Sequence, residues 1–293
     1  MRAVLLAAYG SPSGIDDVER YYTCILGGRK PPQSLLAELR ERYAAIGGVS
    51  PLTEITGRQA EGLRRQLSGM GVEAVVRVGM KYSPPFIADS IAEFRKSGFQ
   101  RVDVIPLTPF NSSVSIESYL AIARNAAGRD GEIVVTGPAD WHLNRHFIDC
   151  WTDLLKRELR GKEVVIFTAH SIPQKYIDAG ERYRDEIVEV AGVLAGQLGL
   201  GSHYVAFQSA GRTADKWIGP ALTETLSGLR EAGVKDVLLA PIGFVSEHLE
   251  VLYDIDIEAK KLAGEMGMQL RRTGLPDDNP EFIKALADAC TGS

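Results

Sequence analysis

The chain has 293 residues, 45% of them hydrophobic and 24% charged, which is ordinary for a globular protein and enough for two domains. A formal charge of -5 and an isoelectric point near 5.7 argue against nucleic acid or an anionic membrane as a partner. The first apolar run is too short for a signal peptide, no run is long enough to cross a bilayer, and Cys24, Cys150 and Cys290 are too far apart to suggest a disulfide framework. We therefore expect a cytoplasmic protein without membrane insertion.

Short apolar runs recur along the chain and predict buried strands of parallel sheets, because strands covered on both faces need no polar alternation. In chain order these are Ala3–Ala8, Ala74–Gly79, Val102–Leu107, Ile133–Thr136, Val164–Thr168, Tyr204–Gln208, Val237–Pro241 and Leu270–Thr273. Segments with one apolar stripe at helical spacing are predicted at Ser34–Tyr43, Thr53–Ser68, Pro85–Lys96, Val114–Ala127, Arg145–Leu159, Arg182–Gln197, Ile218–Ala232, Leu249–Met266 and Pro280–Ala289. This alternation predicts an α/β protein with two Rossmann-like domains, each a four-stranded parallel sheet flanked by helices.

The two halves of the chain repeat the same pattern. The segment from Val4 to Pro12 echoes the segment from Val165 to Pro173, so that Tyr9 falls opposite His170, and later strand and helix segments echo each other as well. Buried strands draw on few residue types, which could produce such echoes by accident. Because the echoes follow the same order in both halves, we predict an internal duplication.

We place the first domain at residues 1–140 and the second at residues 141–293, and we expect the terminal helix, residues 280–290, to pack back on the first half. The first domain carries an insertion at about residues 16–52 that is rich in Tyr, Arg and Gly. Aromatic and guanidinium groups suit a flat, anionic ligand. A solvated helical excursion with Tyr as cap and filler explains the insertion equally well, and the residues alone leave both interpretations open.

Ionisable residues follow two predicted strands of the second half. His170 ends an apolar strand and precedes a Ser-x-Pro turn, whereas His248 and Glu250 open a carboxylate-rich helix. Open α/β sheets hold ligands at the carboxyl edge of their strands, where an imidazole and a carboxylate can act as metal ligand and proton acceptor. A lone histidine is more often structural than catalytic. The histidines that we interpret as structural are His142, His146 and His203.

The helix predicted from Leu249 carries Glu250, Asp254 and Glu258 every four residues, on one face. Like charges on one stripe repel each other unless water, basic residues or a cation compensate them, and only Lys260 and Lys261 lie close in sequence. A solvated acidic face is the commoner explanation of such a run. The position of this stripe at a strand end, after His248, favours a cation.

Several motifs of this chain belong together in a known order. They are Ala8–Pro12, Glu19–Tyr22, Gly28–Pro31, Arg42–Leu52, Ala169–Pro173, Gln208–Ser209, Trp217–Pro220 and Gly243–Asp256. With them the chain resembles the ferrochelatase family, which inserts ferrous iron into a porphyrin, and within it the coproporphyrin-using bacterial branch. The resemblance spans nearly the whole chain and implies two chelatase-type domains with the porphyrin between them.

The resemblance also implies roles for single residues. His170 and Glu250 match the catalytic pair on one side of the macrocycle, where they bind the incoming iron or take pyrrole protons, and Tyr9 matches a tyrosine on the opposite face, axial to the inserted iron. Asp254 and Glu258 match an outer cation site, whose hard carboxylates would also tolerate Mg²⁺. The positions that match contacts to the macrocycle or its propionates are Arg42, Tyr43, Ser50 and Tyr119.

One departure from the family pattern affects substrate recognition. Close relatives carry two adjacent arginines where this chain has Leu26-Gly27, which implies weaker propionate binding there or binding redirected to Arg29, Lys30 or Arg42. No tightly bound cofactor is expected, because Fe²⁺ enters as substrate and the cysteines cannot form the iron–sulfur cluster of some family members. We expect a monomer whose partners are the porphyrin and ferrous iron.

The chemistry implied by the resemblance is distortion of the macrocycle in a rigid cleft, followed by removal of its pyrrole protons by neutral His170 and by Glu250. Coproporphyrin III is the favoured substrate and protoporphyrin IX the second. Two alternatives stay open. One is a cobalt or nickel chelatase of the sirohydrochlorin type, and the other is a tetrapyrrole-binding protein without catalysis.

Overall fold

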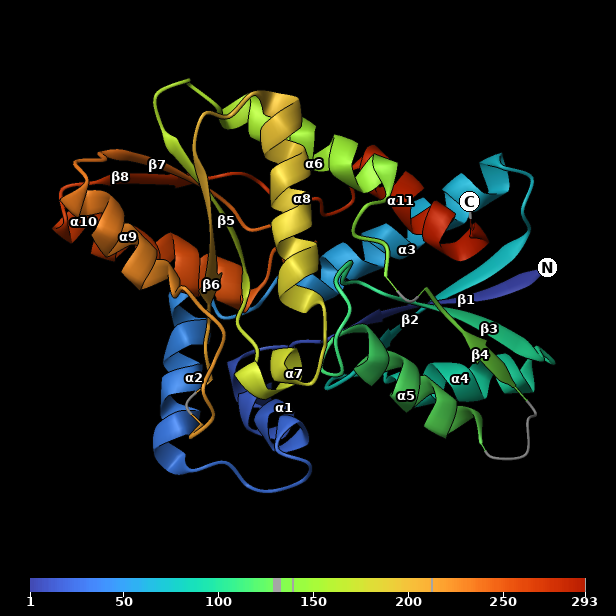
Figure 1. Ribbon diagram of the computed structural model, residues 1–293. Coiled ribbons are helices and arrows are strands. Elements are labelled where there is room, and N and C mark those ends of the chain that lie inside the picture. The colour runs from blue at the N-terminus through green and yellow to red at the C-terminus, as the bar shows by residue number, and fades with distance from the viewer. Residues whose placement is uncertain (129–132, 139, 212, 293) are drawn as a thin grey trace.

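The computed structural model describes residues 1–128, 133–138, 140–211 and 213–292. Its strands form two four-stranded parallel sheets, ordered β2-β1-β3-β4 and β6-β5-β7-β8 (Figure 1). The first sheet consists of β1 (Arg2–Ala8), β2 (Ala74–Met80), β3 (Arg101–Pro106) and β4 (Val134–Thr136). The second consists of β5 (Val164–His170), β6 (His203–Gln208), β7 (Asp236–Ala240) and β8 (Gln269–Arg272). The predicted fold class is confirmed, and the identical strand order in both sheets agrees with an internal duplication.

Helices flank both sheets (Figure 1). They are α1 (Val18–Ile25), α2 (Gln33–Ala45), α3 (Leu52–Gly69), α4 (Ile87–Lys96), α5 (Ile116–Ala127), α6 (Arg145–Glu158), α7 (Gln174–Asp178), α8 (Tyr183–Leu198), α9 (Leu222–Glu231), α10 (Lys260–Glu265) and α11 (Pro280–Thr291). A 3₁₀ turn, η1 (Ile15–Asp17), and a π-helix, η2 (Val251–Ala259), complete the described elements. Within the described residues, no helix is long and apolar enough to cross a membrane.

The central strands β1 and β5 occupy the same place in their sheets. Residues Ala3–Ala8 are buried, and so are residues 165–169, because helices cover both faces of each sheet. Both strands therefore present a polar side chain where they reach the carboxyl edge. That side chain is Tyr9 after β1 and His170 at the end of β5.

The insertion reaches across to the second half of the chain. Val18 of α1 and the α2 residues Leu36 and Tyr43 form a small hydrophobic cluster with Leu249, which begins the helix that carries Glu250. Figure 1 shows α1 and α2 lying below the second sheet rather than beside the first. The helix α1 was not predicted from the sequence, whereas α2 agrees with the predicted helix.

The predicted helix from Leu249 to Met266 is not a regular α-helix. Its middle is the π-helix η2, and only its end, α10, returns to α-helical hydrogen bonding. Long π-helical segments are rare and occur most often at functional sites. The wider turn changes the register of the carboxylates relative to a regular helix: Asp254 and Glu258 lie on η2, and Glu250 immediately precedes it.

The terminal helix α11 packs against α3 and β3 of the first half as well as against α6. The Arg2 side chain donates a hydrogen bond to the Cys290 carbonyl oxygen at 2.7 Å, and Asn144 donates one to Asp288 at 3.0 Å. The chain end is thus held at the first sheet, and buried residues of both halves form one continuous hydrophobic core.

At Gly243 the loop after β7 approaches β5 closely. A Cβ atom at this position would lie 2.6 Å from the Ala169 Cα atom, next to His170. We expect Gly243→Ala to lower the free energy of unfolding by about 1–3 kcal/mol, because backbone must move to admit the methyl group. Gly228→Ala in α9 is the matched control, since a Cβ at this position meets no described atom within 4 Å. This substitution should raise the free energy of unfolding by about 0.5–1 kcal/mol. Equal urea midpoints for the two variants would contradict this account.

Candidate active site

His170 and Glu250 meet although they are far apart in sequence. The His170 Nε2 atom lies 3.5 Å from the Glu250 Oε1 atom, and each side chain is 33% exposed. His170 is the last residue of β5, and Glu250 lies one residue before η2. The structure therefore brings the two predicted catalytic residues together at the carboxyl edge of the second sheet.

The two groups hold each other in the charged state. Burial opposes a charge on His170, but the Glu250 carboxylate and the Ser171 carbonyl outweigh it and raise the pKa of His170 to about 9. Burial likewise opposes a charge on Glu250, yet His170 and His248 hold the pKa of Glu250 well below its ordinary value. At neutral pH the pair is an imidazolium and a carboxylate. The expectation of a neutral His170 is therefore not met.

Neighbouring groups fix the orientation of the His170 ring. Its Nδ1–H donates a hydrogen bond to the Ser171 carbonyl oxygen, which leaves Nε2 directed at Glu250. The Tyr183 hydroxyl donates to the His170 carbonyl oxygen at 2.9 Å. On the other side of Glu250, the His248 Nε2 atom lies 3.7 Å from Oε2. The imidazole thus cannot rotate without losing a hydrogen bond.

Tyr9 stands at the corresponding edge of the first sheet. Its ring packs edge-on against Tyr82 with 4.7 Å between centroids, and the Tyr82 N–H donates to the Tyr9 carbonyl oxygen at 3.0 Å. Gly10 has a φ of 93°, and a Cβ there would lie 2.4 Å from the Ser83 Oγ atom, so only glycine fits this turn. Desolvation, Tyr82 and Glu250 raise the pKa of Tyr9, which is therefore a neutral phenol facing the same carboxylate.

Tyr43 and Tyr119 lie in the same neighbourhood. Burial raises the pKa of both, and the charge of Glu250 adds to this for Tyr43. Between Tyr119 and Tyr82 lies Lys81, whose Nζ atom is 5.5 Å and 5.2 Å from the two ring centroids and 3.1 Å from the Ser118 Oγ atom. Burial lowers the pKa of Lys81. The phenol of Tyr9 thus lies among aromatic rings, and Lys81 contacts two of them, Tyr82 and Tyr119.

Arg42 and Asp254 satisfy each other. The Arg42 guanidinium forms an ion pair with the Asp254 carboxylate, and it stacks over the Tyr253 ring at 4.8 Å. The Ser209 hydroxyl donates to the same carboxylate. The acidic stripe is therefore compensated by a base from the insertion, whereas Lys260 binds Asp256 instead. Glu258, the last member of the stripe, is exposed.

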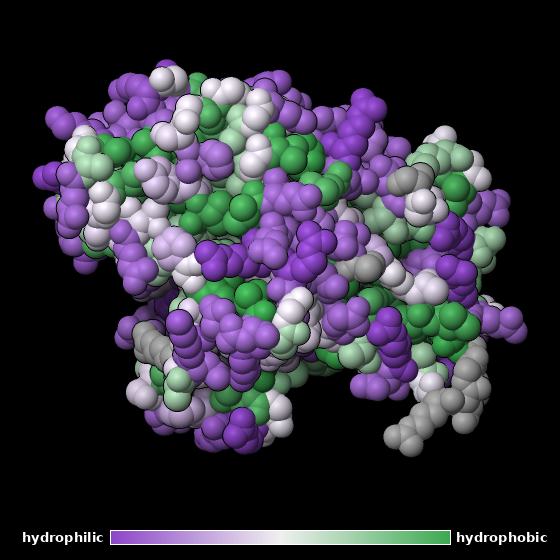
Figure 2. All heavy atoms as spheres, in the orientation of Figure 1, coloured by the Kyte–Doolittle hydropathy of each residue, from purple (hydrophilic) through white to green (hydrophobic). Residues whose placement is uncertain are grey.

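An open cavity of about 620 Å³ lies beside the turn after Tyr9. Ser11, Arg20, Ser50 and Ser83 are among its lining residues, and the buried Ser50 accepts a hydrogen bond from the Leu52 N–H at 3.3 Å. Arg20 is bound to Asp17 by two hydrogen bonds at the cavity edge. This cavity contains none of His170, Glu250 and Tyr9 among its described lining residues. Figure 2 shows the surface hollowed between the lower lobe, where α1 and α2 lie, and the upper lobe of the second half.

Arg29 does not lie in this group. Its side chain is exposed, and its Nε–H donates to the Leu26 carbonyl oxygen at 3.2 Å. Lys30 is also exposed and lies 3.5 Å from Glu19. Of the bases that the sequence offered in place of two arginines, only Arg42 reaches the ring of aromatic and acidic side chains.

Comparison with known proteins agrees with this geometry. A family model described as Ferrochelatase matches residues 1–293. The chain belongs to the ferrochelatase family. As a family member it is a metal chelatase, an enzyme of the lyase class. The coproporphyrin III ferrochelatases of Geobacillus sp. (strain WCH70) and Anoxybacillus flavithermus are each 40% identical to this chelatase over 97% of its chain, which corresponds to 95% and 93% of those relatives.

Solved structures share the fold of this chelatase. SirB from Bacillus subtilis with Fe³⁺ aligns over 99% of this chain and 94% of its own, with a TM-score of 0.65 and 15% identity. CbiX, described as the terminal enzyme of siroheme biosynthesis in denitrifying bacteria, aligns over 100% of this chain and 99% of its own, with a TM-score of 0.57 and 14% identity. At this identity the likeness concerns the fold alone, with two parallel sheets per chain.

Sequence reasoning missed three residues of the site. Lys81 follows the predicted strand at Ala74–Gly79, so the rule applied to His170 could have found it. Arg20 was recognised only as part of the insertion. Tyr183 begins a helix with no motif of its own, and the sequence gives no sign that its hydroxyl reaches the His170 backbone.

Removing the charge of Glu250 should release the proton of His170. In Glu250→Gln the opposing effect of burial remains, so we expect the pKa of His170 to fall from about 9 to below its ordinary value of 6.5. The ring would then be neutral at pH 7. Titration of the His170 ring by NMR measures this shift.

The matched control is Glu258→Gln, a change two helical turns along the same element, which should leave the His170 titration near 9. A titration of His170 that is the same in Glu250→Gln and in the unmodified chain would refute the assigned pairing.

Proposed function

We propose that this chelatase inserts Fe²⁺ into coproporphyrin III, with His170 and Glu250 on the metal-entry side of the macrocycle and Tyr9 on the other. The observation that carries the proposal is the convergence of a histidine, a carboxylate and a phenol from the carboxyl edges of two separate sheets. The relatives at 40% identity carry the name coproporphyrin III ferrochelatase, which supports the choice of substrate.

Insertion exchanges two pyrrole protons for one Fe²⁺ ion. Glu250 is ionised and can accept the first pyrrole proton, but His170 and His248 lower its pKa and make it a weak base while they hold it in an ion pair. His170 starts as an imidazolium and has no free lone pair at Nε2, so it must lose its proton before it binds iron. Protonation of Glu250 removes the charge that holds this proton on His170. The carboxylate holds one pyrrole proton, and the imidazolium proton and the second pyrrole proton pass to water, which reaches the pair because each side chain is 33% exposed. The lone pair freed at Nε2 is then available to iron, for which nitrogen is a suitable ligand.

The rigid surroundings of the pair favour distortion of the ring. The His170 ring is fixed by Ser171 and the His170 backbone by Tyr183, while Tyr9 is fixed by Tyr82 and the tight turn at Gly10. A planar porphyrin directs its nitrogen lone pairs inward, where a metal cannot approach all of them. We infer that binding energy from the carboxylates and ring faces bends the macrocycle toward the metal-entry side.

Cationic groups around the cleft suit a substrate with several carboxylates. Arg20 and Ser50 line the open cavity, Lys81 lies near Tyr119, and Arg42 lies beside Tyr43 in sequence and structure. Coproporphyrin III has four carboxylates and protoporphyrin IX has two. Three separate cations thus favour the tetracarboxylate, and Arg20 takes the place of the arginines that Leu26-Gly27 replaces.

We further propose that Asp254 and Glu258 form the outer cation site, at which Fe²⁺ pauses or Mg²⁺ binds. Burial raises the pKa of Asp254, and Arg42 counteracts this. A cation at Asp254 would compete with Arg42 for the carboxylate. The site therefore binds metal weakly while Arg42 is in place, which suits a relay more than a store.

Substrate choice is tested by steady-state iron insertion under anaerobic conditions. We expect kcat/KM for coproporphyrin III to exceed that for protoporphyrin IX by at least 10-fold, about 1.4 kcal/mol, because two additional carboxylates meet cations. Arg20→Gln should reduce this preference more than Arg29→Gln, since Arg20 lines the open cavity whereas the exposed Arg29 binds the Leu26 carbonyl oxygen. Insertion into sirohydrochlorin but into neither porphyrin would contradict the proposal, as would porphyrin binding without turnover.

The role of His170 is tested by His170→Ala. We expect the rate of iron insertion to fall by about 100-fold or more while porphyrin affinity, followed by fluorescence, stays within a few-fold of the unmodified value. His203→Ala is the control, because His203 is exposed at the opposite end of the neighbouring strand β6. If His170→Ala turned over iron at the control rate, His170 would have no part in the reaction.

A further inference from the structure

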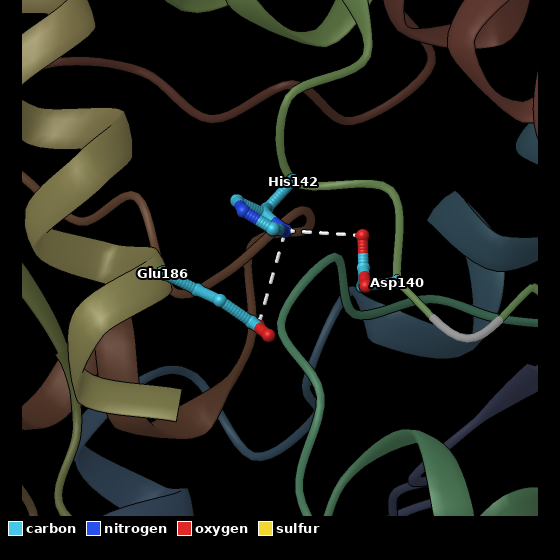
Figure 3. Close-up of side chains that lie close together, drawn as sticks. All are labelled: Asp140, His142 and Glu186. Atoms are coloured by element: carbon cyan, nitrogen blue, oxygen red, sulfur yellow. Dashed lines mark ion pairs between the residues drawn. The ribbon is translucent and has the colours of Figure 1, made fainter. Parts of the chain in front are cut away.

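A second group of metal-ligating side chains lies outside the proposed active site. Asp140 and His142 belong to the segment that joins β4 to α6, and Glu186 belongs to α8 (Figure 3). One ligand atom from each residue lies within 4.8 Å of the others. The His142 Nδ1 atom is 3.3 Å from Asp140 Oδ1 and 3.9 Å from Glu186 Oε2.

The orientation of the His142 ring determines which atom faces the carboxylates. Its Nε2 atom lies 3.3 Å from Glu189 Oε2, so an Nε2–H donated to that carboxylate leaves Nδ1 as the ring atom that faces Asp140 and Glu186. The side chain is only 6% exposed, and among the described residues no group forms a hydrogen bond with Nδ1. Figure 3 shows Nδ1 directed between Asp140 and Glu186. A lone pair facing two carboxylates is repulsive unless a cation lies between them.

The charge of Arg182 acts on Glu186 only from a distance. Glu186 is buried, accepts a hydrogen bond from the Asn111 N–H at 2.8 Å, and has its pKa raised by burial. The Arg182 guanidinium forms an ion pair with the Glu189 carboxylate, with 3.7 Å between nitrogen and oxygen. Another grouping, His146 with Asp149 and Glu281, differs because His146 Nδ1 is already bound to Glu281 at 2.8 Å.

We propose that Asp140, His142 and Glu186 bind a divalent transition-metal ion of the Zn²⁺ type, which fastens the connection between the two halves to α8. Zinc with bonds of about 2.1 Å separates tetrahedral ligands by about 3.4 Å, close to the 3.3 Å and 3.9 Å seen here. A metal-bound histidine typically donates its other N–H to a carboxylate, as His142 does to Glu189. Asp140 is 45% exposed, which leaves a path for the ion and room for a water ligand.

The test measures Zn²⁺ alone bound to the full chain, by equilibrium dialysis after treatment with a chelator. Because Zn²⁺ can also enter the His170–Glu250 site, every protein carries His170→Ala and Glu250→Gln. Into this background we introduce Glu186→Gln, which keeps the acceptor for the Asn111 N–H, or His142→Gln. The matched control is Glu181→Gln, a carboxylate just before α8 that contacts Ser113 and lies outside the cluster.

We expect the background protein and the Glu181→Gln control to bind one equivalent of Zn²⁺ more than the Glu186→Gln and His142→Gln proteins. Zn²⁺ at about 100 times its Kd should raise Tm by roughly 5 °C only where the cluster is intact. Co²⁺ in its place should give a d–d absorption band that Glu186→Gln abolishes. Equal Zn²⁺ stoichiometry in all four proteins would overturn the proposal. So would an NMR spectrum in which His142 stays doubly protonated with and without Zn²⁺, because a proton would then be the cation.

Discussion

The ion pair between His170 and Glu250 places two charges where water has only partial access, which is costly unless each charge compensates the other. The structure meets this condition with groups from three elements: β5 supplies the imidazole, the helix after Leu249 supplies the carboxylate, and α8 supplies the Tyr183 hydroxyl that holds the His170 backbone. A dication that reaches this pair finds a carboxylate ligand, but the ring nitrogen that would be its second ligand still carries a proton. Metal entry and proton release are therefore the same event in electrostatic terms. In the proposed sequence of steps Glu250 takes one proton, and the remaining two pass to water at the partly exposed pair.

The duplicated fold accounts for the position of the pair and for its asymmetry. Both central strands run buried to the sheet edge and end in one functional side chain, but the first sheet presents the neutral phenol of Tyr9 and the second presents the charged His170. Only the first half carries the insertion, and its α2 helix packs Leu36 and Tyr43 against Leu249 of the second half. The insertion thus holds the carboxylate-bearing helix from the far side of the cleft. A symmetric pair of domains has become a site with two chemically different faces.

The sequence was sufficient to predict those parts of the fold and the site that depend on local patterns. Continuous apolar runs located the strands, and the edge rule for parallel sheets placed His170 and Glu250 near each other before the fold was known. Apolar periodicity could not distinguish η2 from an α-helix, because a stripe of carboxylates every four residues fits both. The partner of Asp254 could not be predicted either, since Arg42 lies 212 positions away and reaches it only through the packing of the insertion. Lys81 was missed for a different reason: the edge rule was applied to histidines and carboxylates but not to amines.

The bond between Arg42 and Asp254 links the two proposed ligands of this chelatase. Arg42 is proposed to bind a substrate carboxylate and Asp254 an outer cation, yet in the structure each is the other's partner, with Ser209 and Tyr253 supporting the contact. A substrate carboxylate that takes Arg42 leaves a buried carboxylate in need of a cation, and a cation at Asp254 releases a guanidinium in need of an anion. Binding of either ligand therefore separates the ion pair, so that the second ligand binds without that free-energy cost. Because such coupling is reciprocal, the porphyrin should increase metal affinity at the outer site by the same factor by which metal increases porphyrin affinity. The ion pair thus favours occupation of the cleft by both substrates over occupation by one.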